Sequence, residues 1–252
     1  MEDKVKLLNA TQIKFLAMIL MLIDHAWALF SSCYLWVDYI GRLAFPLFAF
    51  GITEGYKHTS NFKRYALRLL IFGIISEIPF NLMYASNIIY PFHQNVIFTL
   101  LFGLLTIKFI DNIKIQYKNH NWKKILLNIL GISAISFLSI ISFCDYGFYG
   151  VLMIACLYLF SKSKFLQLIS MIFINCILFK GFFIPITIGN YTFEFVTQGF
   201  AVFALPIMWL YNGKKSLRRE ASQKTNKIVQ YGSYIFYPAH MIILYILGNI
   251  IL

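Results

Sequence analysis

The sequence predicts an all-α fold, a polytopic membrane helix bundle of about nine transmembrane helices with a cytoplasmic N-terminus. The first observation is composition: 60% of the residues are hydrophobic, only 13% are charged, and the mean hydropathy is +0.71. Soluble domains carry about 25% charged residues. The second observation is that the 22 Lys and Arg residues cluster between apolar runs. This pattern is typical of cytoplasmic loops, so the net charge of +12 does not require a nucleic-acid partner.

Apolar runs of spanning length recur along the chain, and a spanning helix needs about 20 mostly apolar residues. Residue 9 or 11 is expected to cap the first helix. We expect helices at about 12–31, 36–55, 65–83, 95–110, 125–143, 147–161, 165–180, 199–212 and 229–251. Pro46 is expected to kink the second. The stretch 181–198 is broken by Pro185 and is read as an outer loop or a re-entrant segment. No repeat or linker is evident, so residues 1–252 are expected to form a single transmembrane domain.

The loop charges predict the orientation. With the N-terminus inside, every Lys and Arg except Arg42 and Lys180 lies in an inner loop or at an inner helix end. The C-terminus then lies outside after nine spans. The first apolar run is too long for a cleaved signal peptide and lacks a small-residue cleavage site. We therefore expect a multi-pass protein of the plasma membrane.

The first helix carries ionisable residues inside an apolar run, from Lys14 to Asp24 and His25. Such residues are costly in a membrane and usually serve a function. Lys14 and His25 are eleven residues apart, which is three turns plus about 20°, so they share one face about 16 Å apart. Asp24 points about 100° away from His25 and need not touch the imidazole.

Membrane depth sorts the polar residues into two layers. The upper layer is Asp24, His25, Arg42, Glu77 and His240, with Asn95, Asp145 and Tyr146 at the outer helix ends. A histidine there can act as a general base that a carboxylate orients, or be a hydrogen-bonded core residue. Arg42 is either a structural clamp, paired with Glu77 or Asp24, or a substrate contact.

The inner layer is basic and suits an anion that approaches from the cytoplasm, such as a coenzyme phosphate. It consists of Lys14, Lys63, Arg64, Arg68 and Glu54. The alternative is positive-inside signalling with contact to lipid headgroups, and for Lys14 a side chain that snorkels to the membrane surface.

The four cysteines indicate little chemistry. Cys156 and Cys176 lie in apolar runs and read as packing residues, whereas Cys33 and Cys144 fall in predicted outer loops and could form a disulfide. Cysteine or histidine spacing typical of a metal site is missing, so no metal is expected.

Four blocks resemble the TraX family in sequence and in order. They are RLAFPLFAFGITEGYKHTSNFKRYALRLL (Arg42 to Leu70), NVIFTL (Asn95 to Leu100), DYGFYGVL (Asp145 to Leu152) and FYPAH (Phe236 to His240). That family is associated with N-terminal acetylation of conjugative pilin. It also looks like a branch of a broader set of transmembrane acyltransferases, which resemble one another in a basic residue, ten intervening residues and a histidine. Lys14 and His25 match that spacing.

The resemblance implies an acetyltransferase that takes acetyl-CoA from the cytoplasm and serves an acceptor on the outer side. His25 would be the general base or a transient acetyl carrier, with Arg42, Asp24 and Glu77 around it. The donor phosphates would be held by Lys14, Lys63, Arg64 and Arg68. The acceptor, a peptide N-terminus or a sugar, would meet Asn95, Asp145, Tyr146, Tyr237 and His240. Membrane lipid is the other expected partner.

Two other functions fit the residues. A transporter or flippase for a small anionic or lipid-linked substrate also needs buried charges near the midplane. A membrane scaffold would use the same polar residues only to hold helices together.

Overall fold

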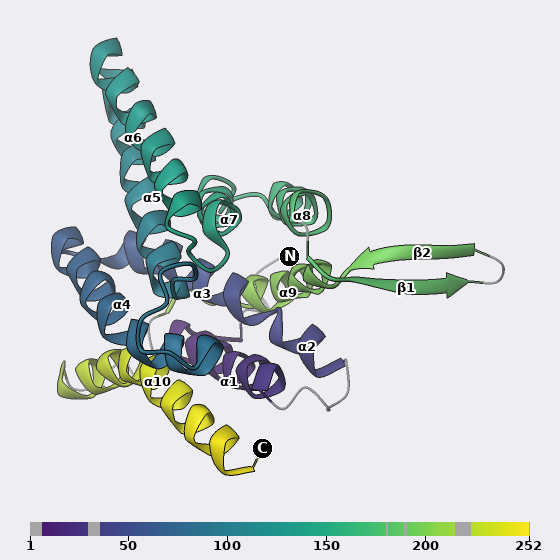
Figure 1. The fold of residues 1–252 in the computed structure, drawn as a ribbon. Helices are drawn as coiled ribbons and strands as arrows, with labels where there is room; N and C mark the ends of the chain where they lie inside the picture. The colour runs from purple at the N-terminus through teal and green to yellow at the C-terminus, as the bar shows by residue number, and fades with distance from the viewer. Residues whose placement is uncertain (1–6, 30–35, 180, 189–190, 215–222, 252) are drawn as a thin grey trace. The chain divides into compact units, whose positions relative to one another are not determined.

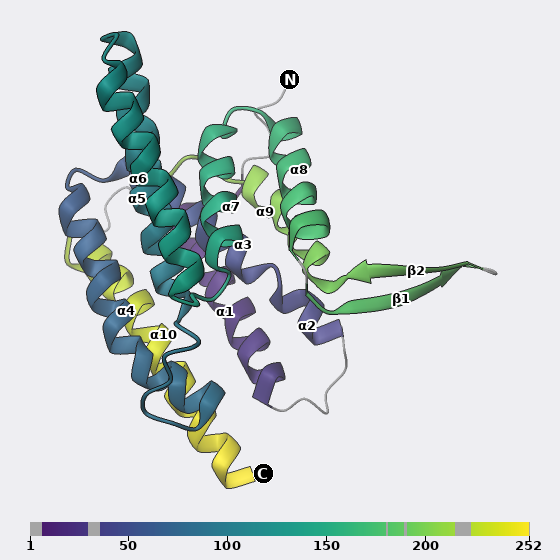
Figure 2. The ribbon, with the colours of Figure 1, turned by 45° about the horizontal axis from the view of Figure 1, so that its top comes forward.

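The computed structural model describes residues 7–29, 36–179, 181–188, 191–214 and 223–251, and helices dominate them (Figures 1 and 2). Within these residues, four helices are long and apolar enough to cross a membrane. They are α4 (Phe62–Ala85), α5 (Val96–Lys118), α6 (Trp122–Ile141) and the part Tyr231–Ile250 of α10 (Gln223–Ile251). The prediction of a helical membrane protein is therefore supported.

The chain forms two compact units. The terminal unit comprises residues 1–51 and 160–252, and the central unit comprises residues 52–159. The terminal unit holds α1 (Ala10–Leu29), α2 (Trp36–Gly41), the start of α3 (Ala44–His58), α8 (Lys164–Ile172), η2 (Phe173–Leu178), β1 (Phe183–Ile188), β2 (Tyr191–Val196), η3 (Thr197–Phe203), α9 (Ala204–Trp209) and α10. The central unit holds the end of α3, then α4, α5, α6 and α7 (Gly147–Leu159).

Helix α1 begins at a reciprocal cap. The Gln12 backbone N–H donates to Asn9 Oδ1, and the Asn9 backbone N–H donates to Gln12 Oε1, both at 3.0 Å. Two of the orphan donors of the first turn are satisfied in this way. Of the two predicted caps, residue 9 is the one used.

The second predicted helix is divided into α2 and α3 by a turn at Arg42 and Leu43. We expected a kink at Pro46, but the break comes earlier. Pro46 lies in the first turn of α3, where a helix needs no backbone N–H from it, so the ring is accommodated without a kink.

The stretch between η2 and η3 forms an antiparallel hairpin, so the chain departs from the predicted all-α class here. Strand β1 pairs with β2 from Phe183 opposite Val196 to Ile188 opposite Tyr191, and the hairpin extends away from the helices of its own unit (Figures 1 and 2). The described sheet has two strands, so each strand keeps one unpaired edge. Because such edges need water or protein, this geometry disfavours exposure of the hairpin to lipid and agrees with either predicted form, a loop or a protein-buried re-entrant segment.

The central unit is held together by close helix packing. Gly103 on α5 lies so near α7 that an added Cβ would come within 2.3 Å of the Ile154 side chain. Asp111 on α5 accepts hydrogen bonds from the hydroxyls of Tyr56 (2.9 Å) and Tyr158, which come from α3 and α7. This cluster ties three helices together at one point.

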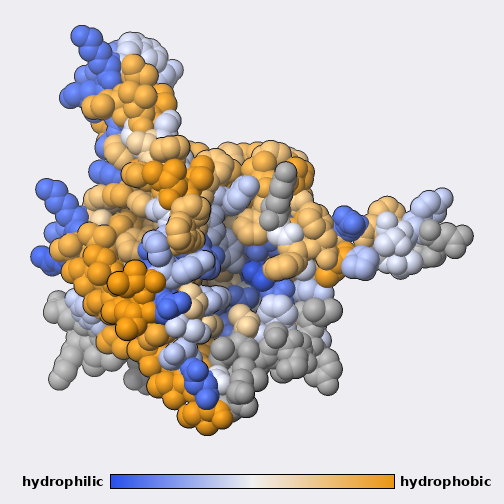
Figure 3. All heavy atoms as spheres, in the orientation of Figure 1, coloured by the Kyte–Doolittle hydropathy of each residue, from blue (hydrophilic) through white to orange (hydrophobic). Residues whose placement is uncertain are grey.

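Apolar side chains cover the outward surfaces of the long helices. On α4 they include Leu67, Ile71, Ile74 and Ile78, and on α10 Ile235, Ile242, Ile243 and Ile246, all of them exposed. Figure 3 shows this apolar covering over α4 and α10. In water so much exposed apolar surface would be a liability, whereas lipid tails solvate it, which is typical of membrane helices.

Candidate active site

Helices α1 and α10 pack side by side in the terminal unit and run parallel (Figure 2). Lys14 and Ser233 line one groove, and farther along His25 hydrogen-bonds His240. On α1 the two residues are eleven positions apart, and on α10 they are seven apart, which is almost two turns. Each pair therefore lies on one helix face, and the two faces meet. We call this contact the α1–α10 seam.

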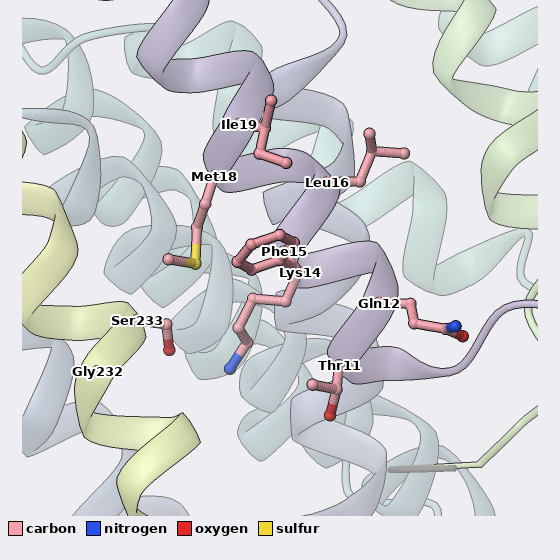
Figure 4. Close-up of a pocket in the computed structure, with 9 residues that line it drawn as sticks. All are labelled: Thr11, Gln12, Lys14, Phe15, Leu16, Met18, Ile19, Gly232 and Ser233. Carbon is pink, nitrogen blue, oxygen red and sulfur yellow. The ribbon is translucent and has the colours of Figure 1, made fainter.

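The lower part of the seam is a groove of about 540 Å³. It is lined by Thr11, Gln12, Lys14, Phe15, Leu16, Met18, Ile19, Gly232 and Ser233. Figure 4 shows the Lys14 ammonium extending from α1 toward the Ser233 side of α10. One cation, two hydroxyls and one amide among mostly apolar walls suit a ligand with a long, mostly uncharged arm and an anionic group.

The upper part of the seam is a pair of buried imidazoles. His25 Nδ1 lies 2.7 Å from His240 Nε2, and the two residues are 7% and 4% exposed. The ring planes differ by 14° and the centroids are 4.9 Å apart. A short N–N contact between nearly parallel rings at this separation means that the rings lie end to end, because the N–N distance plus two ring radii accounts for the centroid separation.

His240 is fixed by its own helix. Its Nδ1 lies 2.7 Å from the carbonyl oxygen of Phe236, one turn earlier. The Phe236 ring stacks on the imidazole with centroids 4.8 Å apart, and the Tyr237 ring meets it edge-on. Tyr237, which was predicted on the acceptor side, also contacts the His25 ring edge-on. The pair is therefore enclosed by aromatic side chains.

Asp24 lies on the face of α1 that packs against α2, and Arg42 lies in the turn that follows α2. A Cβ added to Gly41 would come within 2.4 Å of Asp24 Oδ1, so Asp24 packs against the α2 backbone. Arg42 forms an ion pair with Asp38 at 2.5 Å, and Asp38 is buried. This pairing supports the structural-clamp reading of Arg42 and adds Asp38 as a partner that the sequence analysis did not name.

Hydrogen bonds between Glu77 and Asn95 join α4 to the start of α5 inside the central unit. Glu77 Oε1 accepts hydrogen bonds from the Asn95 backbone N–H (2.9 Å) and from its side-chain amide. The same amide donates to the Gly73 carbonyl at 2.9 Å, and Asn95 Oδ1 caps α5 at Ile97 N. Glu77 thus anchors the start of α5 to α4.

The loop before α7 holds the remaining acceptor-side residues. The Asp145 carbonyl accepts a hydrogen bond from Thr99, and the Asp145 carboxylate lies 4.0 Å from His93 Nε2. Tyr146 adopts φ 60°, in the left-handed region. Cys144 is a free, buried thiol, while Cys33 lies outside the described residues. Burial raises the pKa of the Cys144 thiol, so a thiolate nucleophile is disfavoured there.

The basic residues of α4 lie at its first turns. Lys63 and Arg64 are exposed, and Arg68 is half-buried, with its guanidinium over the Tyr65 ring at 5.5 Å. They belong to the central unit, whereas Lys14 belongs to the terminal unit.

Comparison with known proteins gives the relationship. The family model described as TraX protein matches residues 9–248. The chain belongs to the TraX family. Its sequence is 29% identical over 250 residues to the "Probable fimbrial assembly protein FimC, serogroup H1" of Dichelobacter nodosus, and the match covers 94% of each chain. No solved structure matches it.

Three polar groups of this TraX chain escaped the sequence analysis. Asp38 could have been found, because it precedes Arg42 by four residues, the spacing of a helical ion pair. The buried contact between Gln198 and Asn175, 3.3 Å between side-chain amides of η3 and η2, has no such signal, since the pairing joins distant segments.

Proposed function

We propose that this TraX protein is a multi-pass enzyme of the plasma membrane that transfers an acetyl group from cytoplasmic acetyl-CoA to an amine or hydroxyl at the outer side. The observation that carries the proposal is the α1–α10 seam, where a groove with a lysine and, farther along the same two helices, a buried histidine pair lie between α1 and α10. A cation that holds phosphate and an imidazole that takes a proton are the two parts such a transfer needs.

The chemistry follows from the acceptor. The acceptor nitrogen or oxygen attacks the thioester carbonyl carbon while His25 removes its proton. The carbon–sulfur bond then breaks, and the coenzyme A thiolate leaves with the proton returned by the imidazolium. General-base catalysis of this kind contributes about 10²- to 10⁴-fold. In the alternative path His25 carries the acetyl group between donor and acceptor.

The roles of the other polar residues belong to the same proposal. Lys14 is the donor-phosphate ligand within the seam, and Arg68, Arg64 and Lys63 offer further cations at the start of α4. Asp24 and Arg42 support α1 through α2. Glu77, Asn95, Asp145 and Tyr146 shape the acceptor side through the packing of the central unit.

The acceptor class is suggested by the relative. FimC of Dichelobacter nodosus is named a probable fimbrial assembly protein, and the family is linked to pilin acetylation. We therefore expect the free N-terminal amine of a fimbrial or pilin subunit to be a better acceptor than a cell-wall sugar.

The test uses the full-length protein in lipid vesicles with radiolabelled acetyl-CoA. Peptides with a free N-terminus, the same peptides with a blocked N-terminus, and amino sugars are compared as acceptors. We expect label to move to the free amine, with release of coenzyme A. If neither transfer nor acetyl-CoA hydrolysis occurs, and labelled substrate instead accumulates inside the vesicles, the protein is a transporter.

The membrane orientation has its own test. Parallel packing of α1 and α10 agrees with termini on opposite sides if both helices span. A reporter fused after Leu252 should therefore be active only outside the cytoplasm. A cytoplasmic signal would mean an even number of spans and a different approach for the acceptor.

A further inference from the structure

We infer that His240 is a positioning residue that sets the tautomer of His25, so that Nε2 of His25 is the atom that takes the proton from the acceptor. This inference rests on the proposed function and names the reacting atom within that site. It follows from three contacts of the seam: His25 with His240, His240 with the Phe236 carbonyl, and His240 with the Phe236 ring.

The contact of His240 with the Phe236 carbonyl determines which atom donates in each hydrogen bond of the histidine pair. A carbonyl oxygen only accepts, so His240 Nδ1, 2.7 Å away, must carry a proton. A neutral imidazole has one N–H, which leaves a lone pair on His240 Nε2. That lone pair faces His25 Nδ1 at 2.7 Å, so His25 Nδ1 must be the donor.

The same rule applied to His25 gives the reacting atom. With its single proton on Nδ1, neutral His25 has its lone pair on Nε2. Proton uptake at Nε2 then turns the Nδ1–H bond to His240 into a charge-assisted one, which is shorter and about twice as strong. His240 therefore stabilises the imidazolium as it forms, as a buried partner does for the histidine of a catalytic triad.

The geometry is suited to that role. The two rings lie end to end with planes 14° apart, so the N–H of one points along the lone pair of the other. His240 cannot readily rotate away, because Phe236 stacks on one ring face and Tyr237 packs against its edge. The sequence suggested a carboxylate or a backbone carbonyl as the partner of His25, whereas the structure shows a second imidazole beside it.

The experiment replaces His240 by Gln and by Leu in the full-length protein. Gln can place a side-chain oxygen where Nε2 lies and accept the His25 proton, whereas Leu fills the site without an acceptor. Nitrogen-15 NMR of histidine-labelled protein reports the tautomer of His25 directly. We expect the Nδ1–H tautomer in wild type and in H240Q, and a mixture or the Nε2–H tautomer in H240L.

Activity provides the second measurement. H240L should lose acetyl transfer by about 10²-fold at unchanged acetyl-CoA affinity, whereas H240Q should recover most of the rate. An Nε2–H tautomer of His25 in wild type overturns the inference, and so do equal rates in H240L and H240Q when the wild type transfers acetyl groups. The NMR result decides the inference even if wild type shows no transfer, so its failure and that of the proposed function are distinguishable.

Discussion

The His25–His240 pair and the Glu77–Asn95 pair are both buried contacts between helices, but they differ in what they can do with a proton. A neutral imidazole carries one ring N–H and one ring nitrogen lone pair, so each ring can donate a proton at one nitrogen and accept one at the other. Asn95 offers Glu77 only amide and backbone N–H donors, which do not titrate. The first contact is therefore suited to chemistry and the second to holding α5 on α4.

The comparison shows that burial of a polar residue does not by itself indicate a catalytic role. Asn95 is 0% exposed and His25 is 7% exposed, yet the more buried residue is the helix cap. The partner decides the role. Among the predicted catalytic residues, Glu77 has a structural partner, and its part in catalysis stays a prediction.

The largest expected effect is that of His25→Ala. Removing the base should lower acetyl transfer at least about 10²-fold while acetyl-CoA binding and the melting temperature change little. His58→Ala is the matched control, because this histidine is exposed and lies outside the seam. Near-normal turnover of His25→Ala at equal expression would contradict the assignment of His25 as the general base and make His240 the leading candidate.

The next effect is that of Lys14→Ala on the donor. Loss of one charged hydrogen bond to phosphate should cost about 1.5–3 kcal/mol, or roughly 10- to 150-fold in the dissociation constant of acetyl-CoA. Equilibrium binding at two salt concentrations measures it. Ile19→Ala, which lines the same groove and is exposed, serves as a control for packing. Equal binding by Lys14→Ala and wild type would leave snorkelling as the role of this lysine.

Asn95→Ala should separate stability from chemistry. The variant removes the cap of α5 and the side-chain bonds to Glu77 and Gly73, so the unfolding free energy should fall by about 1–3 kcal/mol. Thermal unfolding in detergent measures the loss. The rate per folded molecule should remain close to wild type, and a 10²-fold loss of rate without destabilisation would place Asn95 in the reaction itself.

The smallest effect is expected for the cations of α4. Arg68→Ala should weaken acetyl-CoA binding about threefold to tenfold, because the guanidinium is only half-buried and solvent screens it. Arg68→Lys keeps the charge and should restore most of the affinity. Competition by dephospho-coenzyme A, weaker than by coenzyme A, would localise the contact to the terminal phosphate; identical competition contradicts it.

Much of the fold could be predicted because membrane helices are specified locally. Length and hydropathy place α4 and α6 within three residues of their observed bounds, since in lipid a chain segment has to satisfy its own backbone hydrogen bonds. Helix α5 continues eight residues past its predicted end, and α10 begins six residues before its predicted start. Prediction was wrong where local signals conflict. Pro46 looked like a kink but lies in a first turn, and the apolar stretch 181–198 contains a strand pair whose backbone partners are not visible in hydropathy.

The sequence by itself determined the membrane class, the TraX relationship and the shared face of Lys14 and His25, because each depends on composition or on spacing along one helix. Only the tertiary structure decided which partners these residues meet. Arg42 pairs with Asp38, Glu77 with Asn95, and His25 with His240, 215 residues away in sequence. The physical reason is that a hydrogen-bond direction depends on the geometry between helices, and helix periodicity says which face a residue is on but not which helix covers it.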